Sequence, residues 1–398
     1  MKIRSITIFD KLRLPLDPDQ IAELSRRTQT ATERFAAAGY EVQTVRLATG
    51  LLARLAPADA VATITQLEAL GNAAGFQFIS AGPAGDCLPV VPELLRATES
   101  VFVTSRIVTP GGRRIDGAKV RQASGVIKAA AKIAEGFGNL RFAALANVGP
   151  GIPFFPAAYW EGEEPAFAIA TESADLAVQA TASAADVAAA HAALQDLVTT
   201  HGQRLQSIAR TFAGEAGMPF LGTDFSLAPF PGAACSIGGA LESITGSPLG
   251  APGTLAAAAL LTDAVQRADF HQTGFCGLMM PVLEDSVLAQ RAAEGRLRVG
   301  ELLQWSAVCG TGLDTVPLPG DVSETAIAGL LFDVAALAIR ARKPLTARLM
   351  PLPGKGAGDP VHFDFAYFAD GGVLPLGEAV EGALSDSETL ALTPYHAL

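Results

Sequence analysis

The sequence alternates between short apolar runs typical of β-strands and longer amphipathic runs typical of α-helices, and this alternation constrains the fold more than any other feature. In the first part of the chain, apolar runs at residues 3–9, 41–47 and 76–80 are separated by helical patterns at 17–39 and 57–74. Strands joined by helices of ten or more residues form βα units, whose strands run parallel in one sheet. We therefore predict an α/β fold with a largely parallel sheet.

The alternation continues in the second half of the chain. Further strands are predicted at residues 101–104, 141–147, 167–171, 275–282 and 346–350, and further helices at 116–136, 184–213, 254–268, 284–294, 299–308 and 323–342. About nine or ten strand candidates are consistent with a closed barrel and equally with an open doubly wound sheet. We find no internal repeat and no Ser/Gly/Pro-rich linker, so we predict a single domain over residues 1–398.

Composition narrows the class of partner. The 398 residues carry a net charge of −11, which argues against nucleic acid and anionic membrane surfaces as partners, since both attract clustered Lys and Arg. No strongly apolar stretch of about 18 residues is present, so no membrane span is predicted. The four cysteines lie far apart without a C-x-x-C pair, which indicates reduced thiols rather than disulfides or structural zinc. We expect a cytoplasmic homo-oligomer that binds a small molecule.

The segment at residues 306–321 is the first candidate site. Its glycines and prolines are incompatible with a continued helix, and it carries Cys309, Thr311, Asp314 and Thr315 within a few positions. Loops of this composition often bear binding or catalytic residues, so we predict a turn-rich functional loop here. Cys309 is a candidate nucleophile, and the structural alternative is a buried thiol.

Two further segments carry candidate residues. Asp224 lies in an aromatic, proline-rich stretch at 222–232, where a carboxyl group would have a raised pKa or need a cationic or metal partner. The alternative is a turn or a helix cap. Arg348 and Lys355 could hold a carboxylate or phosphate, and His362 could act as a base. The alternative for His362 is a hydrogen-bonded structural role.

A divalent cation is an alternative centre for the chemistry. Oxygen ligands suited to magnesium, calcium or manganese are available from Asp224, Glu284, Asp285, Asp314, Asp321, Asp359 and Asp364. No established metal-binding spacing selects among them. The sequence also lacks the G-x-G-x-x-G and G-x-x-x-x-G-K-[ST] patterns, so no nucleotide cofactor is predicted.

Several long runs together resemble a known family. These runs cover residues 1–7, 153–159, 172–176, 222–232, 309–321 and 355–365. On them the chain resembles the domain-of-unknown-function 711 family, an uncharacterised protein family. The resemblance implies a pyruvate formate-lyase-like fold, a β/α barrel of about ten strands. Cys309 would then correspond to the barrel cysteine of glycyl radical enzymes. The expected C-terminal Arg-Val-x-Gly-Tyr loop is absent, and the nearest run, at 369–373, lacks its arginine and tyrosine, so we expect non-radical chemistry.

Our hypothesis is an enzyme, with a lyase or hydrolase favoured, that acts on a small anionic carbonyl or carboxylate metabolite. Cys309, His362 and Asp224 are the catalytic candidates, and Asp314, Thr315, Arg348 and Lys355 are the substrate-binding candidates. A metal-dependent enzyme using clustered carboxylates is one alternative. A non-catalytic binding or sensor protein on an enzyme fold is another, because fold alone does not establish function.

Overall fold

A nine-stranded sheet forms the centre of the molecule in the computed structural model, which describes residues 1–182, 184–378 and 381–395. The strands of this sheet are β1 (Lys2–Phe9), β2 (Val45–Ala48), β3 (Phe78–Pro83), β4 (Val101–Arg106), β6 (Phe142–Ala146), β7 (Ala166–Glu172), β8 (Phe220–Asp224), β11 (Gly312–Pro319) and β12 (Leu345–Leu352). Their spatial order is β11-β12-β6-β4-β3-β2-β1-β7-β8. The predicted α/β class and the largely parallel sheet are confirmed.

The sheet consists of two parallel groups that run in opposite directions. Strands β1, β2, β3, β4 and β6 are parallel to one another, and so are the pairs β7–β8 and β11–β12. The groups meet at two antiparallel contacts, β1 with β7 and β6 with β12. Consequently the amino ends of β1, β2, β3, β4 and β6 lie at the same end of the sheet as the carboxyl ends of β7 and β8.

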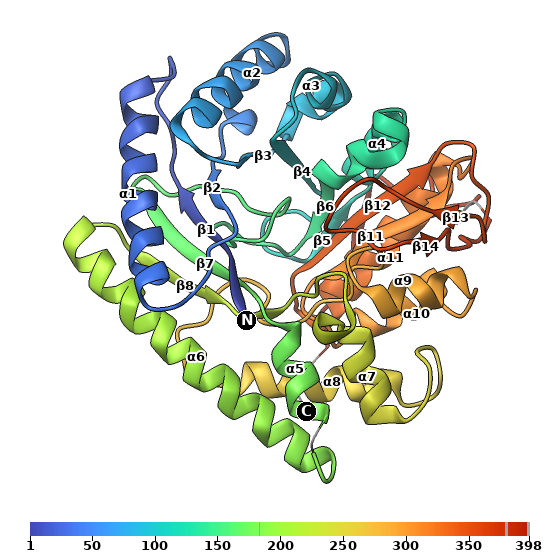
Figure 1. The fold of residues 1–398 in the computed structure, drawn as a ribbon. Helices are drawn as coiled ribbons and strands as arrows, with labels where there is room; N and C mark the ends of the chain where they lie inside the picture. Colours follow the sequence, from blue (N-terminus) through green and yellow to red (C-terminus); the bar gives the residue numbers. More distant parts are fainter. Residues whose placement is uncertain (183, 379–380, 396–398) are drawn as a thin grey trace.

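Helices cover the outer face of this sheet (Figure 1). Their bounds are α1 (Pro18–Ala37), α2 (Pro57–Ala74), α3 (Val91–Ala97), α4 (Gly117–Ala130), α5 (Ala174–Ala182), α6 (Val187–Ala216), α7 (Ile237–Thr245), α8 (Thr254–Gln266), α9 (Ser286–Ala293), α10 (Val299–Trp305) and α11 (Glu324–Ala341). The largest cluster of buried apolar side chains lies between helices and sheet. Among the helices in the described ranges, none has both the length and the apolar character of a bilayer-spanning segment.

The inner face is covered by the interior segment, which we define as residues 148–160. Its Phe154, Phe155 and Tyr159 side chains join two smaller apolar clusters with residues of the strands. Hydrogen bonds tie the segment to the sheet: Ser80 Oγ donates to the Ala158 carbonyl at 2.5 Å, and Thr7 Oγ1 donates to the Pro153 carbonyl at 3.4 Å. The interior segment therefore divides the space on the inner face.

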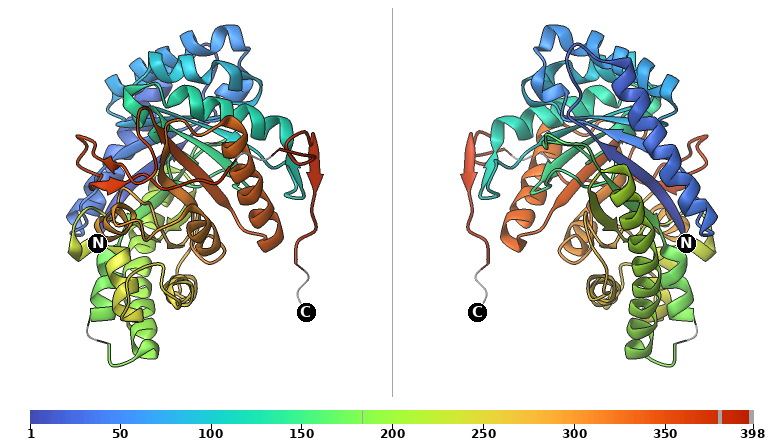
Figure 2. Two further views of the ribbon diagram at one scale, coloured as in Figure 1. Left: turned by 90° about the vertical axis from the view of Figure 1, so that its right-hand side faces the viewer. Right: turned by 90° about the vertical axis from the view of Figure 1, so that its left-hand side faces the viewer.

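Short strands complete the structure. They are β5 (Arg114–Asp116), β9 (Ser226–Leu227), β10 (Gly277–Leu278), β13 (Pro360–Val361), β14 (Gly371–Gly372) and β15 (Thr389–Ala391). The hairpin β13–β14 and the pair β5–β15 lie on opposite sides of the molecule (Figure 2). Isolated parallel bridges join Gln272 to Thr223 beside β8 and Pro281 to Asp314 of β11, so the chain between them contacts both edges of the sheet.

Two sequence predictions require correction. The turn-rich loop expected at 306–321 is in large part a strand, because Gly312–Pro319 forms β11 beside β12. Prolines are tolerated in an edge strand, where one side of the backbone needs no partner. Conversely, the strand expected at 275–282 is reduced to the two residues of β10, since this stretch crosses from one sheet edge to the other.

Candidate functional site

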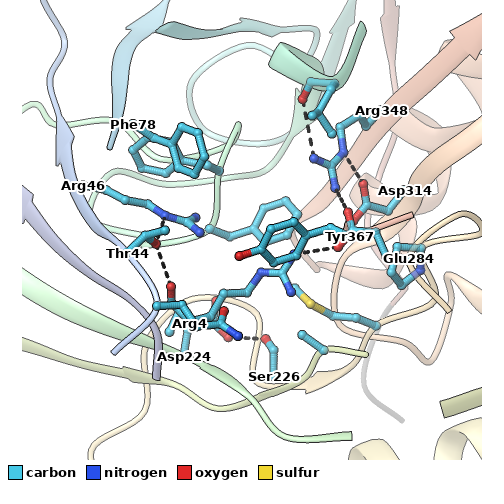
Figure 3. Close-up of a pocket in the computed structure, with 18 of the residues that line it drawn as sticks. Arg4, Thr44, Arg46, Phe78, Asp224, Ser226, Glu284, Asp314, Arg348 and Tyr367 are labelled. Carbon is cyan, nitrogen blue, oxygen red and sulfur yellow. Dashed lines mark hydrogen bonds and ion pairs between the residues drawn. The ribbon is translucent and has the colours of Figure 1, made fainter. Parts of the chain in front are cut away.

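A small cavity of about 80 Å³ lies on the inner face, where the amino ends of β1 to β4 meet the carboxyl ends of β7 and β8 (Figure 3). Its walls combine aromatic side chains with an unusual number of charged ones. The residues that line it include Arg4, Arg46, Arg348, Asp224, Glu284, Asp314, Thr44, Ser226, Phe78, Phe102, Phe154, Phe155, Met279, Phe365 and Tyr367. Charged groups at such depth require partners, so their contacts define what the cavity can do.

One side of the cavity is a continuous network of ion pairs. Arg348 donates from Nε to Asp314 at 2.5 Å and from Nη2 to Glu284 at 2.8 Å. Arg4 donates to the other oxygen of Glu284 at 2.6 Å and to Glu172 at 3.1 Å. Each of the three carboxylates thus has an arginine partner, and the network of three carboxylates and two guanidinium groups retains one negative charge. We call these five residues the paired side of the cavity. Arg4, Glu284, Asp314 and Arg348 line the cavity (Figure 3), and Glu172 joins them through Arg4.

Burial and neighbouring charge act together on the pKa values of the paired side. Burial raises the pKa of Asp314, and the nearby Glu284 carboxylate raises it further, while Arg348 opposes the change. For Arg348 burial alone would lower the pKa, but Asp314 and Glu284 raise it above the ordinary value. Asp314 and Arg348 therefore each stabilise the charged form of the other.

Arg46 of β2 lies in the same cavity without such a partner. Its side chain is 8% exposed, and its Nε donates to Thr44 Oγ1 at 2.9 Å. The guanidinium group lies 5.5 Å from the Phe78 ring centroid and 5.1 Å from that of Phe155. Within the described residues no carboxylate pairs with it, and its Nη1 and Nη2 donate no hydrogen bond to the protein. Burial and the nearby charge of Arg4 lower the pKa of Arg46 to about 9.

Asp224, the last residue of β8, is the other unpaired charge. Its Oδ1 accepts hydrogen bonds from Ser226 Oγ at 2.5 Å and from the Cys276 backbone N–H at 3.1 Å, and its Oδ2 accepts one from the Phe275 N–H at 3.1 Å. The carboxyl group is 1% exposed, and no cation in the described chain pairs with it. Burial outweighs the hydrogen bonds and raises the pKa of Asp224 to about 6. We call Arg46 and Asp224 the open side of the cavity.

The backbone is unusual beside two of these carboxylates. Thr315 has φ 42° and follows Asp314 at a register shift between β11 and β12. Cys276, whose N–H binds Asp224, has φ 33°. Non-glycine residues in the left-handed region are strained and concentrate at functional sites, and bulges re-aim neighbouring side chains. Local strain therefore accompanies the placement of Asp314 and Asp224.

The structure brings together three of the residues proposed from the sequence. Asp224, Asp314 and Arg348 all line the cavity. Thr315 is fully buried beside it, where its Oγ1 accepts a hydrogen bond from the Leu283 N–H at 3.4 Å, so its side chain faces the protein interior.

The other three candidates lie elsewhere. Cys309 is 1% exposed near the end of α10, and its Sγ accepts a hydrogen bond from the Gly312 N–H at 3.3 Å. His362 is exposed at the surface and pairs with Asp370 at 2.6 Å. Lys355 donates to the Pro360 carbonyl at 2.6 Å. The structure does not bring Cys309 and His362 together, because the first packs in the core and the second lies on an exposed turn.

The carboxylates considered as metal ligands are also dispersed. Asp285 caps α9 by accepting from the Val287 and Leu288 N–H groups, and it also accepts from the Ile237 and Gly238 N–H groups at the start of α7. Across the described ranges, no three His, Cys, Asp or Glu side chains are arranged to hold one ion. Glu284 and Asp314 do share the cavity, but both are bound to arginines there.

Sequence reasoning missed the arginines of the first two strands. Arg4 and Arg46 each interrupt an apolar strand pattern, at Ile3-Arg4-Ser5-Ile6 and Val45-Arg46-Leu47. A charged residue inside a buried strand is costly unless it serves a purpose, so this was the available signal. The strand order then places the two residues on adjacent strands, which no local pattern reveals.

Fold and site together define an α/β protein with a buried, charge-lined cavity at one end of its sheet. Comparison with known proteins identifies the family of this chain. A profile of the family described as Uncharacterised ACR (DUF711) matches residues 1–366, and the chain belongs to this family. It is 33% identical over 366 residues to a UPF0210 protein of Pyrobaculum islandicum, covering 86% of this chain and 80% of that protein. A UPF0210 protein of Syntrophobacter fumaroxidans is 33% identical over 316 residues, which cover 75% of this chain and 67% of the relative.

Proposed function

We propose that the cavity binds a small carboxylate or keto acid, and that the protein is an enzyme that transfers a proton to or from this ligand through Asp224. The observation that carries the proposal is the buried Arg46 guanidinium, which faces the cavity and has no carboxylate partner in the described chain. The catalytic assignment rests on the position and pKa of Asp224. It replaces the chemistry that we considered for Cys309 and His362, which do not line the cavity.

Arg46 is built to hold an anion. Burial makes the charge of Arg46 unfavourable, and Arg4 adds repulsion, while Glu284 and Tyr367 of the cavity wall act in the opposite direction. The two Phe rings favour the planar guanidinium group by cation–π contact but supply no hydrogen-bond acceptor. A carboxylate would accept from both free Nη groups in the bidentate geometry that arginine favours. A bound anion would therefore supply the hydrogen-bond acceptors that the protein does not offer to Arg46.

The size of the cavity limits the ligand. A single water needs roughly 10–15 Å³ of such free volume, and about 80 Å³ is present. At that volume per non-hydrogen atom, the ligand has roughly five to eight non-hydrogen atoms. A two- or three-carbon acid fits this limit, and the surrounding aromatic rings favour a compact, partly apolar molecule over a second charged group.

Asp224 has the properties of an acid–base group. With a pKa near 6, it is mostly ionised at neutral pH and can still be protonated within the physiological range. Its three hydrogen bonds hold it in one orientation, and it lines the same cavity as Arg46. The ionised form would accept a proton from a ligand anchored at Arg46, and the protonated form would return it.

The test is a thermal-shift screen of two- and three-carbon acids on wild type and on Arg46→Met. Acetate, glyoxylate, pyruvate and lactate are suitable probes, because a ligand raises the stability of the native state by mass action. We expect at least one acid to raise the melting temperature of wild type, and the variant to need a roughly 10- to 100-fold higher concentration for the same shift. Loss of His362, which is exposed and remote from the cavity, provides the control: His362→Ala should bind as wild type does.

Absence of any shift with these acids, or an equal shift in Arg46→Met, would refute the binding site. The stabilising acid is then incubated with wild type and Asp224→Asn and followed by proton NMR in deuterated buffer. Solvent deuterium entering the acid, or product formation, that depends on Asp224 supports the enzyme. An acid that binds but is recovered unchanged supports the alternative of a non-catalytic binding protein.

We also propose that the sheet closes into the barrel of about ten strands that the family resemblance implies. The support is the chain from Gln272 to Pro281, which forms bridges to Thr223 at one edge and to Asp314 at the other. In a closed sheet this stretch would occupy the place of the tenth strand.

A further inference from the structure

A second hollow, of about 850 Å³, lies at the opposite end of the sheet, where the parallel strands β4 and β6 end at Arg106 and Ala146. We call it the basic cleft. Its walls come from the ends of these strands, from the turn at 109–113, and from the end of α11 with the residues that follow. Ligands of α/β proteins commonly bind outside the carboxyl ends of parallel strands, so this is a favourable location for a site.

The charge of the basic cleft is opposite to that of the whole protein. Arg106, Arg113, Arg342 and Lys343 line it, and Glu161 is the one carboxylate among its lining residues in the described chain. Four cations against one anion stand in contrast to the net charge of −11 of the chain. Local enrichment of one sign in a hollow attracts ligands of the other sign.

Most of these cations are not neutralised by the protein. Arg106 pairs with Glu161 at 2.8 Å. The exposed side chains of Arg113 and Arg342 form no hydrogen bond or ion pair within the described residues. Lys343 donates to the backbone carbonyls of Ser306 and Cys309 and has no carboxylate partner in the described chain. Arg113 and Arg342 therefore give the cleft positive charge that its own residues do not use, and Lys343 adds a third charge without a carboxylate partner.

We propose that the basic cleft binds a ligand that carries a diphosphate group. A surplus of about three positive charges matches the charge of a diphosphate, and arginine binds phosphate oxygens through two parallel N–H groups. The volume lies within the range of about 300–1,000 Å³ that is typical of small-molecule sites, so it accommodates more than the diphosphate alone. Free inorganic diphosphate and a nucleoside diphosphate share this chemistry.

The basic cleft is separate from the carboxylate cavity. Phe102 near the start of β4 lines the cavity, and Arg106 at its end lines the cleft, so four residues of extended chain, about 13 Å, lie between them. The interior segment lies between the two hollows, with Phe155 facing the cavity and Tyr159 facing the cleft. The proposal for the cleft consequently does not depend on the function proposed for the cavity.

Isothermal titration of the full chain with inorganic pyrophosphate and with ADP, in 100 mM salt and a chelator, tests this inference. We expect saturable binding of at least one probe to wild type. The double variant Arg113→Gln/Arg342→Gln should raise its Kd about tenfold or more, since two charge-assisted contacts are lost. Tighter binding of ADP than of pyrophosphate would show that the nucleoside contributes, and equal binding would show that the diphosphate suffices.

The matched control removes two exposed cations elsewhere, in Arg210→Gln/Lys132→Gln, and its Kd should stay within twofold of wild type. Both double variants change only exposed side chains and the same amount of charge, so folding and net charge are equalised. No saturable binding of either probe to wild type would overturn the proposal. An equal loss of affinity in both double variants would also overturn it, because binding would then follow net charge alone.

Discussion

Arg348 and Arg46 line one cavity and are similarly buried, at 5% and 8% exposed, but of the two only Arg348 has carboxylate partners in the described chain. Arg348 donates hydrogen bonds to Asp314 and Glu284, so its charge has carboxylate partners without a ligand. Arg46 is held by one hydroxyl group and two aromatic rings, and it keeps two donors free. We infer that a buried arginine with carboxylate partners, such as Arg348, holds the strands in position. A buried arginine without such a partner, such as Arg46, indicates a binding site for an anion.

The largest expected effect comes from breaking the paired side. Arg348→Met removes one cation and leaves Asp314 and Glu284 buried with less compensation, which costs about 3–5 kcal/mol of unfolding free energy. Urea unfolding at pH 7 measures it. A loss below about 1 kcal/mol, the scale of a surface ion pair, would show that the network contributes little to stability.

The next effect concerns Asp224 and pH. Its pKa rises from 3.8 to about 6 on folding, so the native state binds its proton more tightly than the unfolded state. The resulting stability is present below pH 4 and is lost as the pH rises through 6. At 1.36 kcal/mol per unit the loss is about 3 kcal/mol. Asp224→Asn should lack this loss, which the difference between the two unfolding curves at pH 4 and pH 7.5 reveals.

Arg46 should show the reverse of Arg348. Arg46→Met removes an unpaired buried charge, so the ligand-free protein should be as stable as wild type or more stable by about 1–2 kcal/mol. Binding of the stabilising acid should weaken by roughly 10- to 100-fold, because a charged, bidentate contact is lost. Unfolding and binding are measured on the same preparation. A variant that is strongly destabilised would show that Arg46 supports the fold.

The smallest effect is expected at His362. Its pair with Asp370 is exposed, and such pairs contribute little to stability. His362→Ala should leave both the melting temperature and the affinity for the acid unchanged, as thermal-shift titration would show. A clear loss of affinity would move the site toward this surface and away from the cavity.

Local patterns were sufficient for most of the fold. Helical periodicity and apolar runs located α1, α2, α8 and α11 and the first strands of the sheet, because each such element buries one face against the core. The same reasoning failed for β11, where two prolines indicated a loop. A strand tolerates proline when it lies at the edge of a sheet, and the strand order decides which strands lie there.

Site residues divided in a similar way. Asp224, Asp314 and Arg348 were recognisable as polar residues in apolar or turn-rich surroundings, and they meet in the cavity. Cys309 was selected for its thiol and its glycine- and proline-rich segment, and His362 for its capacity to act as a base. The chemical reactivity of a side chain does not indicate where it points in the folded protein. Cys309 lies in the core, and His362 faces solvent.

The amino-acid sequence by itself determined the α/β class, the largely parallel sheet and the presence of charged residues inside apolar strands, since these depend on periodicity and on the cost of burying charge. Only the tertiary structure decided which charges neutralise one another. Arg4, Arg46, Asp224, Asp314 and Arg348 come from five strands spread over more than 340 positions. Strand order and direction decide which of them form ion pairs and which do not. Arg46 has no carboxylate partner because of the side chains that the assembled sheet places around it. No local sequence pattern can therefore reveal that its charge is unpaired.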